Sequence, residues 1–148
     1  MILELQWEAL LSRAGCRITE PRRVVMRVLE QAQRPLTPQE ILERGKLLHP
    51  NLGLVTVYRT LELFESLDLV CLVHREGGCH GYLLSAPGHR HVLMCDSCGR
   101  AVEFPGQDDL AQLIDRVQQH TGYAVGDHLL QLFGLCPECQ EASGSSVP

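Results

Sequence analysis

Two CxxC pairs are the residues of this chain that are best suited to chemistry. They read Cys95-Asp-Ser-Cys98 and Cys136-Pro-Glu-Cys139, with 37 residues between them. A CxxC turn directs two sulfurs at one point, so two such turns can supply the four thiolates of a closed tetrahedral zinc site. The intervening length is enough for a strand, a helix and a strand. We therefore expect the metal to join the two ends of a small domain.

Disulfides or buried thiols are the alternative interpretation of these cysteines. The chain holds seven cysteines, and an odd number fits a reducing compartment better than a disulfide scaffold. Paired CxxC motifs are also among the stronger cysteine signals for zinc. A thioredoxin-like redox motif fits less well, since one CxxC would suffice and neither pair lies in a βαβ pattern. We predict a structural zinc ion held by Cys95, Cys98, Cys136 and Cys139.

His89 and His91 precede the first CxxC pair and form a second group of possible metal ligands. Side chains two residues apart on a strand share a face, so both imidazoles could reach one ion. For either histidine taken alone, a solvent-exposed role is an equal alternative. The pair beside a zinc site in an acidic segment favours ligation. Other donors nearby are Cys79, His80, Glu103, Asp108, Asp109 and His128.

The first half of the chain carries the signals of several short helices. Apolar residues recur at helical spacing over residues 6–14 and 54–67, and two further helices are expected after Thr19 and Thr37. Both threonines are expected N-caps with a proline in the first turn, and Glu40 completes a capping box with Thr37. A strand, a turn and a strand are expected at residues 69–74, 76–78 and 82–84.

A helix-turn-helix followed by a hairpin describes a winged helix, whose last helix would enter the major groove of DNA. A helical bundle with an added hairpin is the alternative, which local pattern leaves open. Beyond a short linker we expect a helix over residues 108–120, with Leu110, Leu113, Ile114 and Val117 facing inward. Strands are expected at residues 91–94, 101–104 and 129–133.

The sequence therefore predicts an α+β protein with two small domains. The second is too small to be stable by itself, so we expect it to bury a face against a second copy of the chain. The expected parts are a winged-helix DNA-binding domain (1–84), a hinge (85–90), a dimerisation and metal-binding domain with the four-cysteine zinc site (91–141), and a disordered tail (142–148).

Charge is distributed unevenly along the chain, whose net charge is −5. Ten Lys/Arg and nine Asp/Glu give residues 1–75 a charge of +1, whereas three and nine give residues 76–148 a charge of −6. A basic patch on the first half is therefore compatible with the acidic total, and cations are expected on the second half. No segment reads as a signal peptide or a membrane span, so we expect a cytoplasmic protein with no membrane partner.

Several motifs in order resemble the ferric uptake regulator family. They are Arg17-Ile18-Thr19-x-x-Arg22, Thr56-Val57-Tyr58-Arg59-Thr60-Leu61, the histidines before Cys95-x-x-Cys98-Gly99, and Gly134-x-Cys136-x-x-Cys139. The resemblance spans residues 5–140. It implies a homodimeric metal-sensing transcription factor with an N-terminal winged helix, a C-terminal dimerisation domain, a structural zinc and one or two regulatory metal sites. Such proteins usually repress when metal-loaded, at AT-rich inverted repeats.

The resemblance also implies which residues contact DNA. The family role of the TVYR segment transfers to Thr56, Tyr58 and Arg59. Arg59 can bond guanine or phosphate, and Tyr58 offers a ring to a thymine methyl group. Arg22, near the start of the second helix, would bind backbone phosphates together with Arg23. Packing of Tyr58 and solvation of the arginines are the alternatives.

The histidine run departs from the family pattern, because Arg90 interrupts it and His91 lies four residues before Cys95. The usual run supplies imidazoles to both faces of the strand, whereas here only one face is supplied. Two ligand sets resemble the family's regulatory sites. The first, which we favour, is Cys79, His89, His91 and Glu103. The second is His89, His91, His128 and Asp108 or Asp109, with Cys71 and His74 as reserve ligands.

The expected cofactors are a structural zinc ion and a second, regulatory divalent metal. A thiolate ligand from Cys79 favours zinc, and residues 33–36 lack the histidine that iron- and peroxide-sensing members usually supply. We expect a zinc-responsive repressor of metal-uptake genes; iron, manganese or peroxide sensing is the alternative. A zinc hydrolase fits poorly, since a site with four cysteine ligands has no open position and no HExxH, phosphate loop or nucleophile elbow occurs. We expect no small-molecule substrate.

Overall fold

The computed structural model describes residues 2–106 and 110–144 and divides the chain into two compact units. The units are Met1–Pro87 and Gly88–Pro148, so the division falls inside the segment expected as a hinge. The described helices include none that is both long and apolar enough to cross a membrane.

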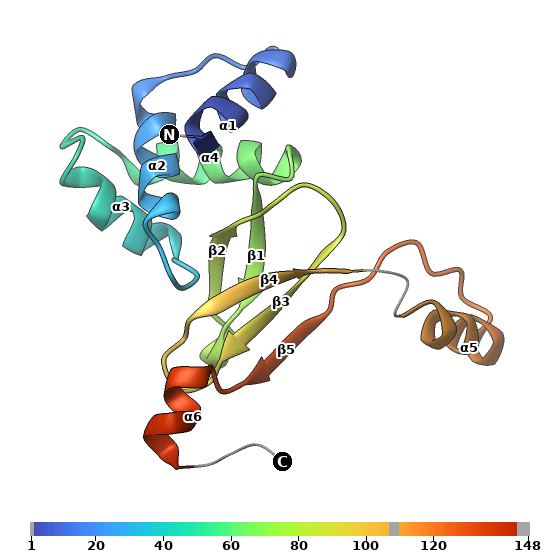
Figure 1. The fold of residues 1–148 in the computed structure, drawn as a ribbon. Coiled ribbons are helices and arrows are strands. Elements are labelled where there is room, and N and C mark those ends of the chain that lie inside the picture. Colours follow the sequence, from blue (N-terminus) through green and yellow to red (C-terminus); the bar gives the residue numbers. More distant parts are fainter. Residues whose placement is uncertain (1, 107–109, 145–148) are drawn as a thin grey trace. The chain divides into compact units, whose positions relative to one another are not determined.

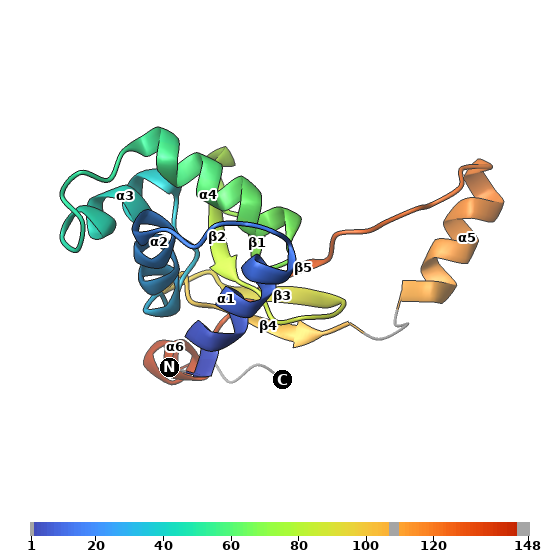
Figure 2. The same ribbon diagram turned by 90° about the horizontal axis from the view of Figure 1, so that it is seen from above.

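The first unit consists of four helices followed by a hairpin (Figure 1). Helix α2 lies between α1 and α3 in all three views, and α4 packs on α2 and α3 (Figure 2). The arrangement is the winged helix that the sequence predicts. The elements are α1 (Ile2–Arg13), α2 (Glu20–Glu30), α3 (Pro38–Lys46), α4 (Leu54–Ser66), β1 (Val70–His74), the 3-10 turn η1 (Glu76–Gly78) and β2 (His80–Leu84).

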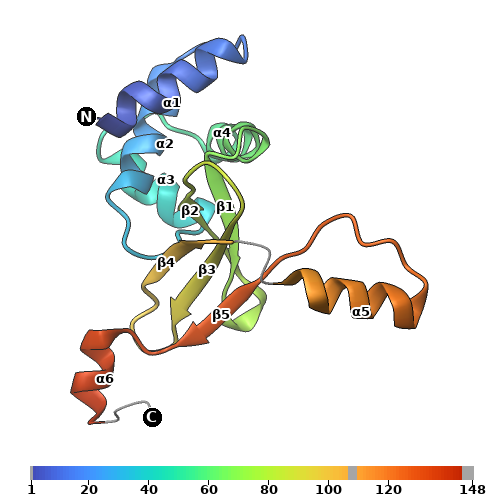
Figure 3. The same ribbon diagram turned by 45° about the vertical axis from the view of Figure 1, so that its right-hand side comes forward.

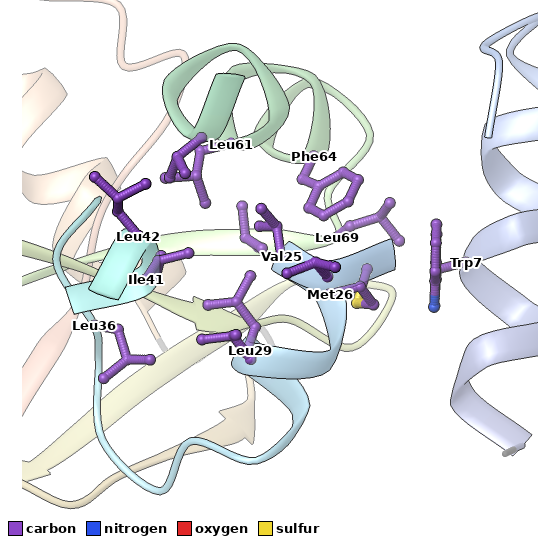
Figure 4. Close-up of a cluster of buried hydrophobic side chains, with 14 of the residues drawn as sticks. Trp7, Val25, Met26, Leu29, Leu36, Ile41, Leu42, Leu61, Phe64 and Leu69 are labelled. Carbon is purple, nitrogen blue, oxygen red and sulfur yellow. The ribbon is translucent and has the colours of Figure 1, made fainter. Parts of the chain in front are cut away.

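One apolar cluster holds these helices together (Figure 4). Val57, Leu61 and Phe64 of α4 are completely buried, as their helical spacing predicts, and Trp7 of α1 packs its ring 6.0 Å from that of Phe64. Burial of such side chains contributes on the order of 1.5–3 kcal/mol each. Helix α4 is therefore fixed by its inner face, which leaves its outer face exposed.

Helix α3 begins with the expected capping box. The Thr37 hydroxyl accepts the Glu40 N–H at 3.2 Å, and the Glu40 carboxylate accepts the Thr37 N–H at 2.8 Å. Helix α2 begins after Thr19 with a proline in its first turn, but the Thr19 side chain makes no capping hydrogen bond. Helix α1 starts four residues before the expected position, at Ile2.

The second unit is built on a three-stranded sheet in the order β4-β3-β5 (Figure 3). Strand β3 (Arg90–Cys95) is antiparallel to β4 (Ala101–Pro105) and parallel to β5 (Gln131–Gly134). The parallel pair requires a crossover, which α5 (Ala111–Thr121) supplies. Helix α6 (Pro137–Ser143) follows the second CxxC turn.

Two expectations for this unit are wrong. The apolar residues of α5 were expected to face inward, yet no residue of the helix is buried, and the side chains of Leu113 and Val117 are 47% and 42% exposed. Their helical spacing predicts an apolar face, but the chain itself does not cover that face. The tail was expected to be disordered from Ala142, but α6 continues to Ser143. The helix begins with Pro137 in its first turn and is followed by Gly144, which has the left-handed conformation of a C-cap. Residues 145–148 lie outside the described part.

Candidate metal centres and nucleic-acid interface

The two CxxC turns meet at the end of the sheet. Cys95 ends β3 and Cys136 is the N-cap of α6, so each pair straddles the boundary of a regular element. The four sulfurs of Cys95, Cys98, Cys136 and Cys139 all lie within 4.8 Å of one another, and those of Cys98 and Cys136 are 3.8 Å apart. Four thiols gathered at one point match the donor set of a closed structural zinc site.

Hydrogen bonds to these sulfurs favour the thiolate form, which is the form that binds a metal ion. Backbone N–H groups of Cys98 and Cys136 point at the Cys95 sulfur and lower the pKa of that thiol to about 6. At Cys139 a hydrogen bond with Ser97 favours the thiolate, but the neighbouring thiols, Cys136 foremost, raise its pKa to about 12. The first proton therefore leaves readily and the last is retained, because four thiolates repel one another. A cation at their centre removes that repulsion.

An ion pair joins the two CxxC turns. Arg100 follows the first turn and Glu138 lies inside the second, with Nη1 and Oε2 2.7 Å apart. The Glu138 carboxylate raises the pKa of Arg100, and the nearby thiolates of Cys136 and Cys98 raise it further. The guanidinium thus offsets part of the negative charge of the cluster and holds the two turns together.

Three histidines form a second cluster in the same unit. His89 precedes β3, His91 lies in it, and His128 lies between α5 and β5. Their ligand nitrogens all lie within 4.8 Å of one another, and Nε2 of His89 is 2.8 Å from Nε2 of His128. The His91 side chain is 2% exposed, whereas His89 is exposed and His128 half-buried. Three converging imidazoles suit zinc, copper, iron or nickel.

Gly106 leaves room for this cluster. A Cβ atom at Gly106 would lie 2.6 Å from Nε2 of His91 and in contact with the His89 ring. The Gly106 N–H also donates to the His89 carbonyl at 2.9 Å. Only a residue without a side chain allows the backbone to approach the two rings so closely.

Glu103 lies on the other face of the sheet. His91 is directly opposite Phe104, and Val92 is directly opposite Glu103, so Glu103 shares its face with Val92 and not with His91. Its carboxylate pairs with Arg90, with Nε and Oε2 3.1 Å apart. Of the two predicted ligand sets, the structure assembles the histidines of the second.

The remaining candidate ligands that the structure describes belong to neither cluster. Cys79 is exposed between η1 and β2, and Cys71 is half-buried in β1, so both belong to the first unit. His74, the other reserve ligand, ends β1. Asp108 and Asp109 lie outside the described residues.

The candidate DNA contacts Thr56, Tyr58 and Arg59 lie in the first two turns of α4. Tyr58 is 47% exposed and Arg59 is exposed, whereas Thr56 is half-buried. The N-cap, Gly53, provides no side-chain hydrogen bond, and the first turn carries no acidic residue, so its N–H groups can bind a phosphate. Arg22 is half-buried and donates to the Arg17 carbonyl.

The sequence model of the ferric uptake regulator family matches residues 13–133. The chain belongs to this family. The ferric uptake regulation protein of Legionella pneumophila is 36% identical over 135 residues, which cover 88% of this chain and 96% of that one. Members of the family regulate transcription in response to metals.

Solved structures of the ferric uptake regulator family share the fold. A zinc uptake regulator complexed with zinc and DNA superposes with a TM-score of 0.80 at 22% identity, covering 96% of this chain and 95% of that one. A zinc-bound manganese uptake regulator gives a TM-score of 0.58 at 29% identity, covering 87% and 97%. The winged helix followed by a small α/β unit is therefore the family architecture.

Sequence reasoning missed two features that shape the centres of this family member. Arg100 and Glu138 carry opposite charges and lie within two residues of cysteines in different turns. These charges could have indicated that the two side chains pair. Gly106 gave no such signal, because its contact with His89 and His91 depends on the antiparallel pairing of β3 with β4.

Proposed function

We propose that this protein is a zinc-responsive repressor that binds DNA as a homodimer and controls metal-uptake genes. The observation that carries the proposal is the presence of two different donor clusters in one small unit, four cysteines and three histidines. A closed thiolate site retains its metal and stabilises the fold, whereas a partly exposed imidazole site can gain and lose an ion. The first is therefore structural and the second regulatory.

The regulatory site consists of His89, His91 and His128, with an acidic fourth ligand from Asp108 or Asp109. The geometry supports this set over the one with Cys79 and Glu103, because His128 is within hydrogen-bond distance of His89 while Glu103 pairs with Arg90. Three imidazoles and a carboxylate complete a tetrahedral zinc shell. Zinc supplies a charge of +2 at this site, and its oxidation state does not change when the ion binds or leaves.

Metal binding acts through the chain that leaves the first unit. Gly88 has φ of 102° and opens the second unit, directly before His89. Gly88 has no side chain to limit its backbone conformation. Fixing the adjacent His89 to His128 restricts that freedom and so favours one placement of the winged helices over the others. A difference in zinc affinity between the two placements is sufficient to shift their populations.

Dimerisation is supported by apolar surface that the chain leaves exposed. Leu93 of β3 pairs with Val102 of β4 and with Leu132 of β5, so the three form one row across the sheet. They are 38%, 51% and 45% exposed. A row of this kind, together with the uncovered face of α5, fits burial against a second copy.

Iron sensing is the second candidate function. The Legionella relative is named a ferric uptake regulation protein, and iron(II) also accepts imidazole and carboxylate ligands. The zinc-bound manganese uptake regulator illustrates that a family member can hold zinc whatever its named metal. Measurements with competing metals are therefore needed to distinguish zinc sensing from iron sensing.

The deciding experiment measures DNA binding by fluorescence anisotropy, on a duplex selected from a random pool by the zinc-loaded protein. Zinc should strengthen binding at least tenfold over protein treated with a mild chelator, and more than anaerobic iron(II) or manganese(II). Binding that is indifferent to removal of the weaker zinc contradicts metal regulation, and a larger response to iron(II) identifies an iron sensor.

Matched variants separate the two ligand sets. His128→Ala should lose the zinc response while Cys79→Ser keeps it, and His120→Ala, an exposed histidine of α5 outside the cluster, should behave as wild type. The reverse result for Cys79→Ser and His128→Ala would assign the site to Cys79 and Glu103.

A further inference from the structure

We propose that the wing carries an additional metal site, formed by His74 and His80, for a divalent ion that prefers nitrogen ligands, such as zinc or nickel. His74 ends β1 and His80 begins β2, on opposite sides of the turn at residues 76–78. Neither residue belongs to the cysteine cluster or to the histidine cluster of the second unit. The site thus lies entirely in the winged-helix unit.

The strand register brings the two histidines directly opposite each other. Tyr82, two residues after His80, exchanges both of its backbone hydrogen bonds with Leu36, on the side of β2 away from β1. Tyr82 and its partner Leu72 are therefore a non-hydrogen-bonded pair of the β1–β2 ladder. Such pairs recur every two residues, so His74 and His80 also form a non-hydrogen-bonded pair. Facing side chains are closest in pairs of this kind, whose Cα atoms are about 4.5 Å apart.

The imidazoles already face each other at this position. Their ring centroids are 4.8 Å apart with an interplanar angle of 74°. The same separation, 4.8 Å, occurs between His89 and His91 of the histidine cluster. Two nitrogens that share one zinc ion lie about 3–3.5 Å apart, since each Zn–N bond is about 2.0–2.1 Å. Small rotations about the side-chain bonds bring this pair to that distance.

The hairpin that carries the pair is held in place. Arg75, next to His74, pairs with Glu40 of α3 at 3.2 Å. Gly81, next to His80, is buried against Pro35, where a Cβ atom would lie 2.6 Å from the proline Cβ. A metal that binds here therefore meets ligands whose backbone is already fixed, which lowers the entropy cost of binding.

Both histidines are exposed, so an ion from solution reaches them without any opening of the fold. Two protein ligands leave at least two positions of a zinc shell to water, which makes the wing site weaker than the four-thiolate site. Imidazole donors select zinc, nickel or copper over magnesium or calcium. The ion adds two positive charges to the unit that we propose binds DNA, which strengthens its attraction to phosphates.

The test counts zinc on the full-length protein by equilibrium dialysis at free zinc levels that saturate the cysteine and histidine clusters. Wild type should bind one further equivalent per protomer, and His74→Ala and His80→Ala should each weaken that equivalent at least tenfold. His120→Ala, an exposed histidine of the second unit, is the matched control and should retain it. Equal uptake by wild type and His80→Ala overturns the proposal.

A second measurement locates the ion. Paramagnetic nickel(II) should broaden the amide signals of residues 74–80 in the NMR spectrum of wild type and leave them sharp in His80→Ala. The rest of the spectrum reports that the variant is folded. If these signals remain sharp in wild type at nickel levels that broaden the histidine cluster, the wing holds no metal and the proposal fails.

Discussion

Arg90 and Glu103 form an ion pair on the face of the sheet opposite His91. Their side chains are 23% and 9% exposed, with Nε and Oε2 3.1 Å apart. The pair joins β3 to β4 and neutralises the carboxylate that the sequence offered as a candidate metal ligand. The Arg90 guanidinium thus lies on the opposite face of β3 from the His91 imidazole.

Glu103→Gln should leave metal binding intact but weaken the fold. The change removes a largely buried, charged hydrogen bond from Arg90, so we expect a loss of about 1–3 kcal/mol in the free energy of unfolding. Zinc affinity of the histidine cluster should stay within about threefold of wild type, a limit of about 0.7 kcal/mol. Urea unfolding and chelator competition measure the two quantities. Asp115→Asn, on the exposed side of α5, is the control. Loss of the regulatory zinc would instead make Glu103 a ligand.

Cys136→Ser should release the structural zinc and abolish the folded second unit. Cys136 starts α6, and its N–H donates to the Cys95 sulfur at 3.3 Å, so the substitution affects both the metal shell and the approach of the two turns. Metal content by mass spectrometry and circular dichroism test this. Cys16→Ser, a half-buried cysteine of the first unit outside the cluster, should keep its zinc. A folded Cys136→Ser protein with wild-type helix content would show that the metal is dispensable for the fold.

Much of the fold follows from local signals in the sequence. The capping box at Thr37 and Glu40, the buried stripe of Val57, Leu61 and Phe64, and the strands that flank residues 76–78 all occur as expected. Each depends on residues near one another in the chain, where backbone preference and apolar spacing decide the outcome. The closeness of the four cysteines was predictable for a related reason, since zinc requires it.

The histidine cluster and the face of α5 depend on distant pairings that local patterns do not encode. His128 joins His89 only because the crossover through α5 returns the chain beside β3, 39 residues later. The register of β3 with β4 turns Glu103 away from His91, which spacing along one strand cannot reveal. Helical periodicity shows only that one face of α5 is apolar, not which molecule covers that face. The expectation that the same chain covers it was therefore wrong.

Gly106→Ala should impair the histidine cluster without affecting the cysteine cluster. The added methyl group would meet His91 Nε2 at 2.6 Å and also contact the His89 ring, so both imidazoles must move. We expect at least tenfold weaker regulatory zinc, or about 1.4 kcal/mol, with the structural zinc retained. Gly126→Ala is the matched control, because a Cβ atom there meets nothing within 4 Å. Equal zinc affinities for the two variants would contradict the role assigned to Gly106.

Glu40 should make stability depend on pH in the acid range. Burial raises the pKa of this carboxyl, but the Thr37 N–H and the Arg34 guanidinium outweigh it and lower the pKa to about 2 from 4.5. Because the folded pKa is depressed, the stabilisation is complete above pH 4.5 and is lost as the pH falls toward 2. Glu40→Gln should cost about 1–3 kcal/mol at pH 6 and progressively less below pH 4.5.

The Glu40 titration can be followed directly by carbon NMR of the side-chain carboxyl in the intact protein. Comparing the unfolding free energy of wild type with that of Glu40→Gln at each pH cancels the acid dependence of the zinc sites. Glu43→Gln, on the exposed surface of the same helix, is the control and should show no such trend. A carboxyl that titrates near 4.5 would show that the capping box and Arg34 do not stabilise its charge.

Arg59→Ala should weaken DNA binding in a way that reveals what Arg59 contacts. The side chain is exposed on the outer face of α4, while Val57 and Leu61 on the inner face are buried, so its removal leaves the helix packed. If Arg59 binds a phosphate, affinity falls about equally on all duplexes and the slope of log K against log salt decreases by about 1. If it reads guanine, binding to the selected duplex falls by about 1–3 kcal/mol and sequence preference relaxes. Arg116→Ala, exposed on α5 of the second unit, is the matched control. Wild-type affinity and salt slope in Arg59→Ala would exclude the Arg59 side chain from the DNA interface, because the substitution removes its charge while α4 stays packed.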